Sequence, residues 1–102
     1  MNQKEIISKV REAVESDPNK DYIQSIYLFG SFLHGDATDN SDVDLLFEPR
    51  KSMGFFKLFD IQYHLEHKLN KKVDLRTKED LSKYFRNEVT KEAKRIYDHD
   101  EA

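Results

Sequence analysis

GSFLHGDATDNSDVDLLFE, the stretch from Gly30 to Glu48, decides how this chain folds and what it does. A Gly-Ser turn, Gly30-Ser31, ends one apolar run, and after ten further residues Asp42 and Asp44 open the next. Because side chains alternate along a strand, Asp42 and Asp44 would lie on one face, about 7 Å apart along the chain. Carboxylates placed on strands are costly unless something positive binds them. We therefore expect a cation at this point of the chain.

Composition and charge bound the class of protein. The length of 102 residues suits one compact domain, residues 1–102, and 36% charged residues predict a heavily solvated surface. The net charge of −3 argues against a general nucleic-acid binder, since Lys and Arg hold phosphate backbones. The absence of cysteine excludes disulfides and thiolate metal sites. No apolar run approaches the ~18 residues of a membrane span, and no signal peptide is recognisable, so we expect a cytoplasmic protein.

Hydrophobic spacing predicts the order helix, strand, strand, helix, strand, helix, with a short helical turn after Ser31. The predicted strands are the apolar run that ends at Phe29, the alternating run from Val43 to Phe47, and the short run Val73–Leu75. This pattern predicts an α/β (α+β) fold in which helices flank a sheet.

The three predicted helices carry apolar residues three or four positions apart. They cover residues 2–15, the segment from Phe55 to Leu69, and a last helix with Leu81, Phe85, Val89, Ala93 and Ile96. Thr77 and Asp80 resemble the N-cap of that last helix. We expect Phe55, Phe56 and Phe59 to belong to the core, with an apolar lip for a base or a partner, formed by Met53-Gly54-Phe55-Phe56, as the alternative.

A third acidic residue, Asp74, lies inside the short run KKVDLRT. If its strand lies beside the strand of Asp42 and Asp44, all three carboxylates converge. Repulsion between like charges would then raise at least one pKa, and a bound cation would remove that penalty. Oxygen ligands without cysteine favour Mg²⁺ or Mn²⁺ over Zn²⁺.

Gly30 and Ser31 supply the complementary half of such a site. Glycine lets the backbone turn sharply and approach a ligand closely. A helical turn that starts after Ser31 would point free N–H groups at an anion, and the Ser31 hydroxyl would add a donor. Metal on one side and N–H groups on the other would together hold a nucleoside triphosphate.

The pattern of Gly30-Ser31, ten residues, Asp42-x-Asp44 and then Asp74 resembles the nucleotidyltransferase superfamily of DNA polymerase beta, and within it the minimal nucleotidyltransferases (MNT). This resemblance implies a mixed sheet flanked by helices. It also implies that Asp42, Asp44 and Asp74 bind the metals that grip ATP, and that Asp74 helps to deprotonate the attacking hydroxyl.

The resemblance further implies a partner. Many minimal nucleotidyltransferases are antitoxins that transfer AMP from ATP to a tyrosine hydroxyl of a HEPN-domain ribonuclease toxin. Their phosphate-binding loop commonly reads Gly-Ser-x-Ala-Arg-Gly, whereas this chain has Gly30-Ser31-Phe32-Leu33-His34-Gly35. His34 thus stands where a basic residue is usual, and Gly30, Ser31, His34 and Gly35 are the expected phosphate-binding residues. A hetero-oligomer with the toxin follows from the same resemblance.

Other interpretations stay open on the sequence alone. The chain could neutralise a partner by complex formation without chemistry, or it could transfer a nucleotide to a small molecule or to RNA. His64 and His67 have a spacing that can bind metal, but a solvated helix face is the simpler interpretation.

Overall fold

Four strands form one mixed sheet, which the computed structural model describes together with the rest of residues 1–101. The strands are β1 (Ile23–Phe29), β2 (Val43–Pro49), β3 (Val73–Arg76) and β4 (Lys94–Asp98). They lie in the order β3-β2-β1-β4. β1 pairs antiparallel with both β2 and β4, whereas β2 and β3 run parallel, as a strand–helix–strand connection requires. The predicted mixed sheet is confirmed.

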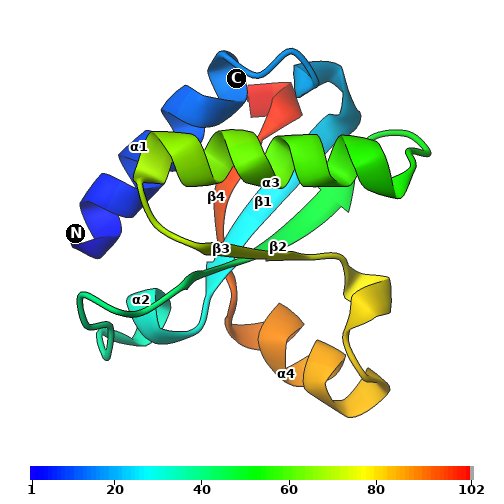
Figure 1. The fold of residues 1–102 in the computed structure, drawn as a ribbon. Coiled ribbons are helices and arrows are strands. Elements are labelled where there is room, and N and C mark those ends of the chain that lie inside the picture. The colour runs from blue at the N-terminus through cyan, green and yellow to red at the C-terminus, as the bar shows by residue number, and fades with distance from the viewer. Residues whose placement is uncertain (102) are drawn as a thin grey trace.

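The helices cover both faces of this sheet (Figure 1). α1 (Gln3–Glu15) and α3 (Phe55–Leu69) lie together over one face, and α4 (Lys83–Glu92) lies on the opposite side. The short helix α2 (Ser31–His34) follows β1 directly, as predicted. Three 3₁₀ turns complete the chain: Lys20–Tyr22, Lys78–Asp80 and His99–Glu101.

Alternation along β2 divides its side chains between two apolar clusters. Val43, Leu45 and Phe47 are buried in the larger cluster, which α1 and α3 cover. Leu46 faces the other way and packs with Val89 of α4. Asp44 shares the face of Leu46, so the pleat itself keeps this carboxylate out of the larger core.

The predicted last helix is wrong at its C-terminal end. α4 ends at Glu92, and Ile96 lies on β4, a strand that the sequence did not predict. Val89, Ala93 and Ile96 are four and three residues apart, which is a helical spacing. The backbone nevertheless pairs with β1, where Ile26 lies opposite Tyr97. The Ile96 carbonyl also accepts a hydrogen bond from Arg11 Nε of α1 (2.8 Å). Pairing with a sheet edge therefore outweighs the local helical spacing.

The expected helix cap at Thr77 and Asp80 closes a 3₁₀ turn rather than α4. Thr77 N donates to Asp80 Oδ2 (3.1 Å), and the turn ends two residues before α4. Ser82 caps α4 itself, since its hydroxyl accepts from Phe85 N (3.3 Å). Two short capped elements thus replace one long helix.

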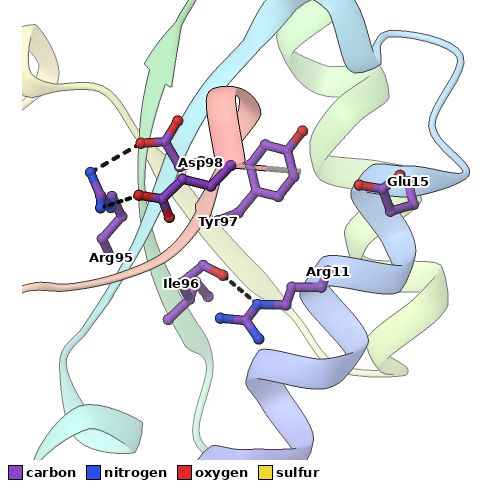
Figure 2. A pocket seen from close by; sticks show the side chains of 7 residues that line it. Arg11, Glu15, Arg95, Ile96, Tyr97 and Asp98 are labelled. Atoms are coloured by element: carbon purple, nitrogen blue, oxygen red, sulfur yellow. Dashed lines mark hydrogen bonds and ion pairs between the residues drawn. The ribbon is translucent and has the colours of Figure 1, made fainter.

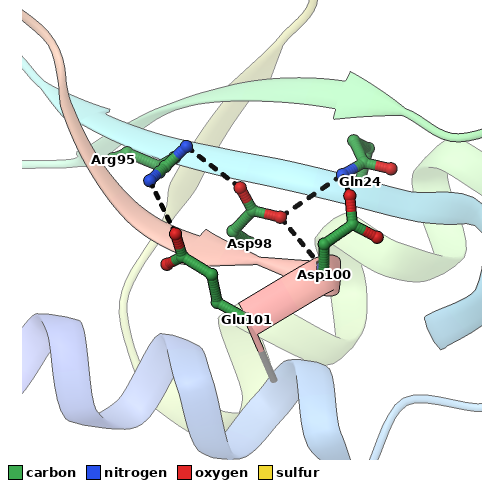
Figure 3. A network of polar contacts seen from close by, with 5 residues as sticks. All are labelled: Gln24, Arg95, Asp98, Asp100 and Glu101. Atoms are coloured by element: carbon green, nitrogen blue, oxygen red, sulfur yellow. Dashed lines mark hydrogen bonds and ion pairs between the residues drawn. The ribbon is translucent and has the colours of Figure 1, made fainter.

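A polar network fastens the C-terminal turn to the sheet (Figure 3). Asp98 accepts from Gln24 Nε2 of β1 (3.3 Å) and from the Asp100 backbone (2.9 Å). Arg95 pairs with Asp98 and with Glu101, both at 3.0 Å. These contacts hold β4 in place at the edge of the sheet.

The prediction that the three phenylalanines of α3 belong to the core is wrong. Phe55, Phe56 and Phe59 are 75%, 88% and 57% exposed. Ile61, Leu65 and Leu69 form the buried face of α3, and the phenylalanines lie outside it. None of the helices within residues 1–101 is long and apolar enough to cross a membrane.

Candidate active site

Asp44 and Asp74 lie side by side on neighbouring strands. The parallel pairing of β2 and β3 places Asp44 opposite Asp74, with Val43 opposite Val73 and Leu45 opposite Leu75. Each aspartate stands between two residues that are buried in the core, so the alternation that packs the core also points both carboxylates to the other face. The expected position of Asp74 beside the strand that carries Asp44 is therefore confirmed, whereas Asp42 lies just before β2 and is exposed.

The electrostatics of Asp44 reflect this crowding. Partial burial raises the pKa of Asp44 above its ordinary value of 3.8, and the charges of Asp74 and Asp42 raise it further. Arg76 opposes these effects. The ionised Asp44 is thus held at a cost that a cation placed between the carboxylates would offset.

Arg76 is a member of this site that the sequence analysis missed. Its Nε lies 3.0 Å from Asp74 Oδ1, and this ion pair raises the pKa of Arg76. Arg76 lies two positions after Asp74 and so on the same face of β3, which was the available signal. The guanidinium neutralises part of the acidic charge of the neighbouring Asp44 and Asp74.

The donor set fits a hard divalent cation. Only carboxylate oxygens are offered, and a cation beside them would favour the ionised form of Asp44, whose pKa is raised first by burial and then by the charges of Asp74 and Asp42. Within residues 1–101 no group of three or more His, Asp or Glu side chains is arranged to hold a metal ion as it stands, and Arg76 pairs with Oδ1 of Asp74. Cation binding would therefore require the aspartate side chains to change position.

Gly30 lies directly against Asp44. Its backbone has φ +76° and ψ −153°, a conformation that residues with a side chain rarely adopt. A Cβ built on Gly30 would overlap Asp44 Oδ2. The Gly-Ser turn and the acidic pair are thus brought together by the antiparallel pairing of Phe29 with Asp44.

The expected phosphate-binding loop consists of α2 and the glycines at its two ends, Gly30 and Gly35. The Gly30 carbonyl accepts from Leu33 N and His34 N, both at 3.1 Å, and Gly35 ends the helix with φ +79°. The His34 Nε2 atom lies 3.2 Å from Glu92 of α4. His34 thereby joins α2 to α4, and its contact with phosphate remains a prediction, as does that of Ser31.

The two histidines of α3 have separate partners. His64 Nε2 lies 3.1 Å from Ser16 Oγ, and His67 Nε2 lies 3.2 Å from the Tyr63 hydroxyl. These contacts support the helix-face interpretation over a shared metal.

A separate cleft of about 470 Å³ lies along β4, at the edge of the sheet opposite β3 (Figure 2). Ile96, Tyr97 and Asp98 of β4 line it together with Arg11 and Glu15 of α1. Since the aspartate pair lies on β2 and β3, this cleft is distinct from the candidate active site.

Comparison with known proteins identifies the class. Residues 9–102 match the family model described as polymerase beta, nucleotidyltransferase. The chain therefore belongs to the polymerase beta nucleotidyltransferase family. A Methanocaldococcus jannaschii protein, MJ1215, named as a candidate protein adenylyltransferase, is 35% identical over 75 residues, which are 74% of this chain and 84% of that protein. The protein adenylyltransferase MntA of Thermococcus cleftensis is 31% identical over 70 residues, 69% of this chain and 71% of that protein.

Solved structures with this fold include toxin–antitoxin complexes. A crystal structure of a toxin–antitoxin with AMP-PNP has a TM-score of 0.68 at 26% identity and covers 96% of this chain and 74% of that one. A complex of a tri-AMPylated Shewanella oneidensis HEPN toxin with its MNT antitoxin has a TM-score of 0.66 at 21% identity, covering 94% and 72%; at this identity the likeness is one of fold. The chain is a nucleotidyltransferase of the MNT type.

Proposed function

We propose that this chain transfers AMP from ATP to a tyrosine hydroxyl of a cognate HEPN ribonuclease toxin in the cytoplasm, and so acts as its antitoxin. One observation carries the proposal: Asp44 and Asp74 stand side by side, with the Gly30 backbone directly against Asp44. Relatives named protein adenylyltransferases and a structural neighbour with AMP-PNP support the choice of ATP and of a toxin partner.

In this proposal each residue of the site has a separate role. Asp42, Asp44 and Asp74 would hold Mg²⁺, or Mn²⁺, which when bound supplies charge stabilisation to the α-phosphate and to the leaving pyrophosphate. Gly30 would let the backbone approach the phosphates, and Ser31 would donate a hydroxyl to a phosphate oxygen, with His34 and Gly35 closing the loop.

The reaction is one displacement at phosphorus. The tyrosine oxygen forms a bond to the α-phosphorus, and the bond from that phosphorus to the bridging oxygen of the β-phosphate breaks, releasing pyrophosphate. Asp74 orients the hydroxyl and accepts its proton. Arg76, which pairs with Asp74, controls where that carboxylate points.

Cation binding is expected to stabilise the folded chain. Mg²⁺ or Mn²⁺ at about 100 times its Kd should add roughly 2.7 kcal/mol to the free energy of unfolding, since it binds the folded acidic cluster. The measurement is the Tm with and without each cation, for the wild type and for Asp44→Asn. An equal rise in Tm for both proteins would contradict cation binding at Asp44.

The transfer itself is tested by intact-mass spectrometry of the protein encoded by the adjacent reading frame. That protein is incubated with this chain, Mg²⁺ and ATP, beside an Asp42→Asn/Asp44→Asn variant. We expect gains of whole AMP units with the wild type and none with the variant. A stable complex without any mass gain would refute AMP transfer and favour neutralisation by binding alone.

A further inference from the structure

Four aromatic side chains give α3 an apolar outer face that the active site does not use. We call Phe55, Phe56, Phe59 and Tyr63 the α3 aromatic surface; they are 75%, 88%, 57% and 64% exposed. Phe55, Phe59 and Tyr63 recur every four residues and therefore share one side of the helix. The rings of Phe55 and Phe59 stack at 6.5 Å between centroids. So much clustered aromatic surface is unusual on a chain that works alone.

A cleft of about 600 Å³ continues this surface past the N-terminal end of α3. Phe55 belongs to both, and Phe47, Met53 and Leu58 give the cleft an apolar part, to which Ser52, Thr77 and Asp80 add polar groups. Its volume and apolar lining suit insertion of a large apolar side chain from a partner.

Basic side chains border the same region in ordered positions. Arg50 and Lys51 line the cleft. The Nζ atoms of Lys51 and Lys57 lie 4.8 and 4.1 Å from the centroid of the Tyr22 ring, as cation–π pairs do. Asp80 also lines the cleft, but Arg50, Lys51 and Lys57 outnumber it and leave the border with net positive charge. Such a border around an apolar centre matches a partner segment that is apolar in the middle and acidic around it.

We propose that the α3 aromatic surface and the adjoining cleft form the docking site for the toxin, which would present an apolar segment bordered by carboxylates. This inference rests on the proposed function for the identity of the partner. A second copy of this chain fits less well, since a two-fold contact through the same surface would bring the basic rims of both copies together.

Docking and chemistry then occupy different sides of the sheet. α3 and α4 lie on opposite faces of the sheet (Figure 1). Asp44 shares the face of Leu46, which packs with Val89 of α4, and so points away from the face that α3 covers. The surface therefore anchors the toxin without touching the nucleotide. Substitutions there should weaken the complex and leave nucleotide binding intact.

The test measures the Kd of the adjacent-frame protein for Phe55→Ser/Phe59→Ser, made in the Asp42→Asn/Asp44→Asn background so that binding is read without transfer. We expect the Kd to rise about 100-fold or more, as loss of central aromatic anchors does. Lys51→Glu/Lys57→Glu should also weaken binding, and more so at low salt. Tyr84→Ser on α4 removes an aromatic residue that is 78% exposed outside this surface, and it should leave the Kd unchanged.

A control shows whether the Phe55→Ser/Phe59→Ser variant folds. In the otherwise wild-type chain, we measure the affinity of this variant for AMP-PNP and the Tm of the variant. Both should match the wild type. An unchanged Kd for the toxin would overturn the docking site, even if AMP transfer is found. A wild-type dimer that the variant dissociates would instead assign the surface to a second copy, and so would overturn the proposal too. A weakened complex without any mass gain would leave docking standing and refute only the proposed chemistry.

Discussion

Asp44→Asn should abolish AMP transfer while leaving a chain that is at least as stable as the wild type. Metal-bound carboxylates contribute several kcal/mol of transition-state stabilisation, so a loss of about 10³-fold or more in rate is expected. Asparagine keeps the shape of aspartate but removes the charge. The measurement is the rate of AMP incorporation by intact mass, beside the Tm of the same protein.

The stability of this variant should depend on pH in a defined direction. The folded pKa of Asp44 is raised above 3.8, mainly by burial and then by Asp74 and Asp42. Ionised Asp44 therefore disfavours the folded state above that raised pKa, and the penalty vanishes below about 3.8. Without added metal, Asp44→Asn should exceed the wild type in Tm at neutral pH, and the two should converge as the pH falls through this range. A variant that is less stable than the wild type at neutral pH would refute this electrostatic account.

Gly30→Ala should damage both the fold and the site. The Gly30 backbone has φ +76° in a region that is almost restricted to glycine, so alanine should cost about 1–3 kcal/mol of unfolding free energy. Its Cβ would also overlap Asp44 Oδ2 and push this carboxylate from its place beside Asp74. We expect a lower midpoint in urea and no detectable AMP transfer.

Substitutions at two other glycines separate the effect of backbone strain from the effect of the contact with Asp44. Gly35 has φ +79° but open space where a Cβ would stand, so Gly35→Ala should show the backbone strain without crowding Asp44. Gly54 has neither a positive φ nor a close neighbour, and Gly54→Ala should keep the stability and AMP-PNP affinity of the wild type. Equal effects of Gly30→Ala and Gly54→Ala would contradict the contact with Asp44.

The fold and the centre of the site could be predicted because both depend on alternation along two strands. Val43 and Leu45 on β2, like Val73 and Leu75 on β3, must enter the core, and this requirement alone turns Asp44 and Asp74 to the other face. The pairing of the two strands was only a condition in the sequence analysis, and the structure supplies it, with α3 as the crossover that parallel strands need.

Features that depend on partners far away in the sequence could not be predicted from the alternation of residues along a strand. Ile96 has a helical spacing from Val89, and only the open edge of β1 draws it into β4. Phe55, Phe56 and Phe59 have the composition of a core, but Ile61 and Leu65 already fill the buried side of α3. Arg76 reads as an ordinary charged strand residue until its ion pair with Asp74 is seen.

The pairing of Asp44 with Asp74 also limits which insertions and deletions the gene can accept. Asn70 ends α3 with a positive φ of 54°, and Glu66 Oε2 accepts from Val73 N (2.9 Å), so the start of β3 is fixed. Loss or gain of one residue between α3 and β3 would exchange inward and outward positions, placing Asp74 in the core and Leu75 or Val73, respectively, in the site. Length changes in this connection should therefore be selected against as strongly as loss of the aspartate itself.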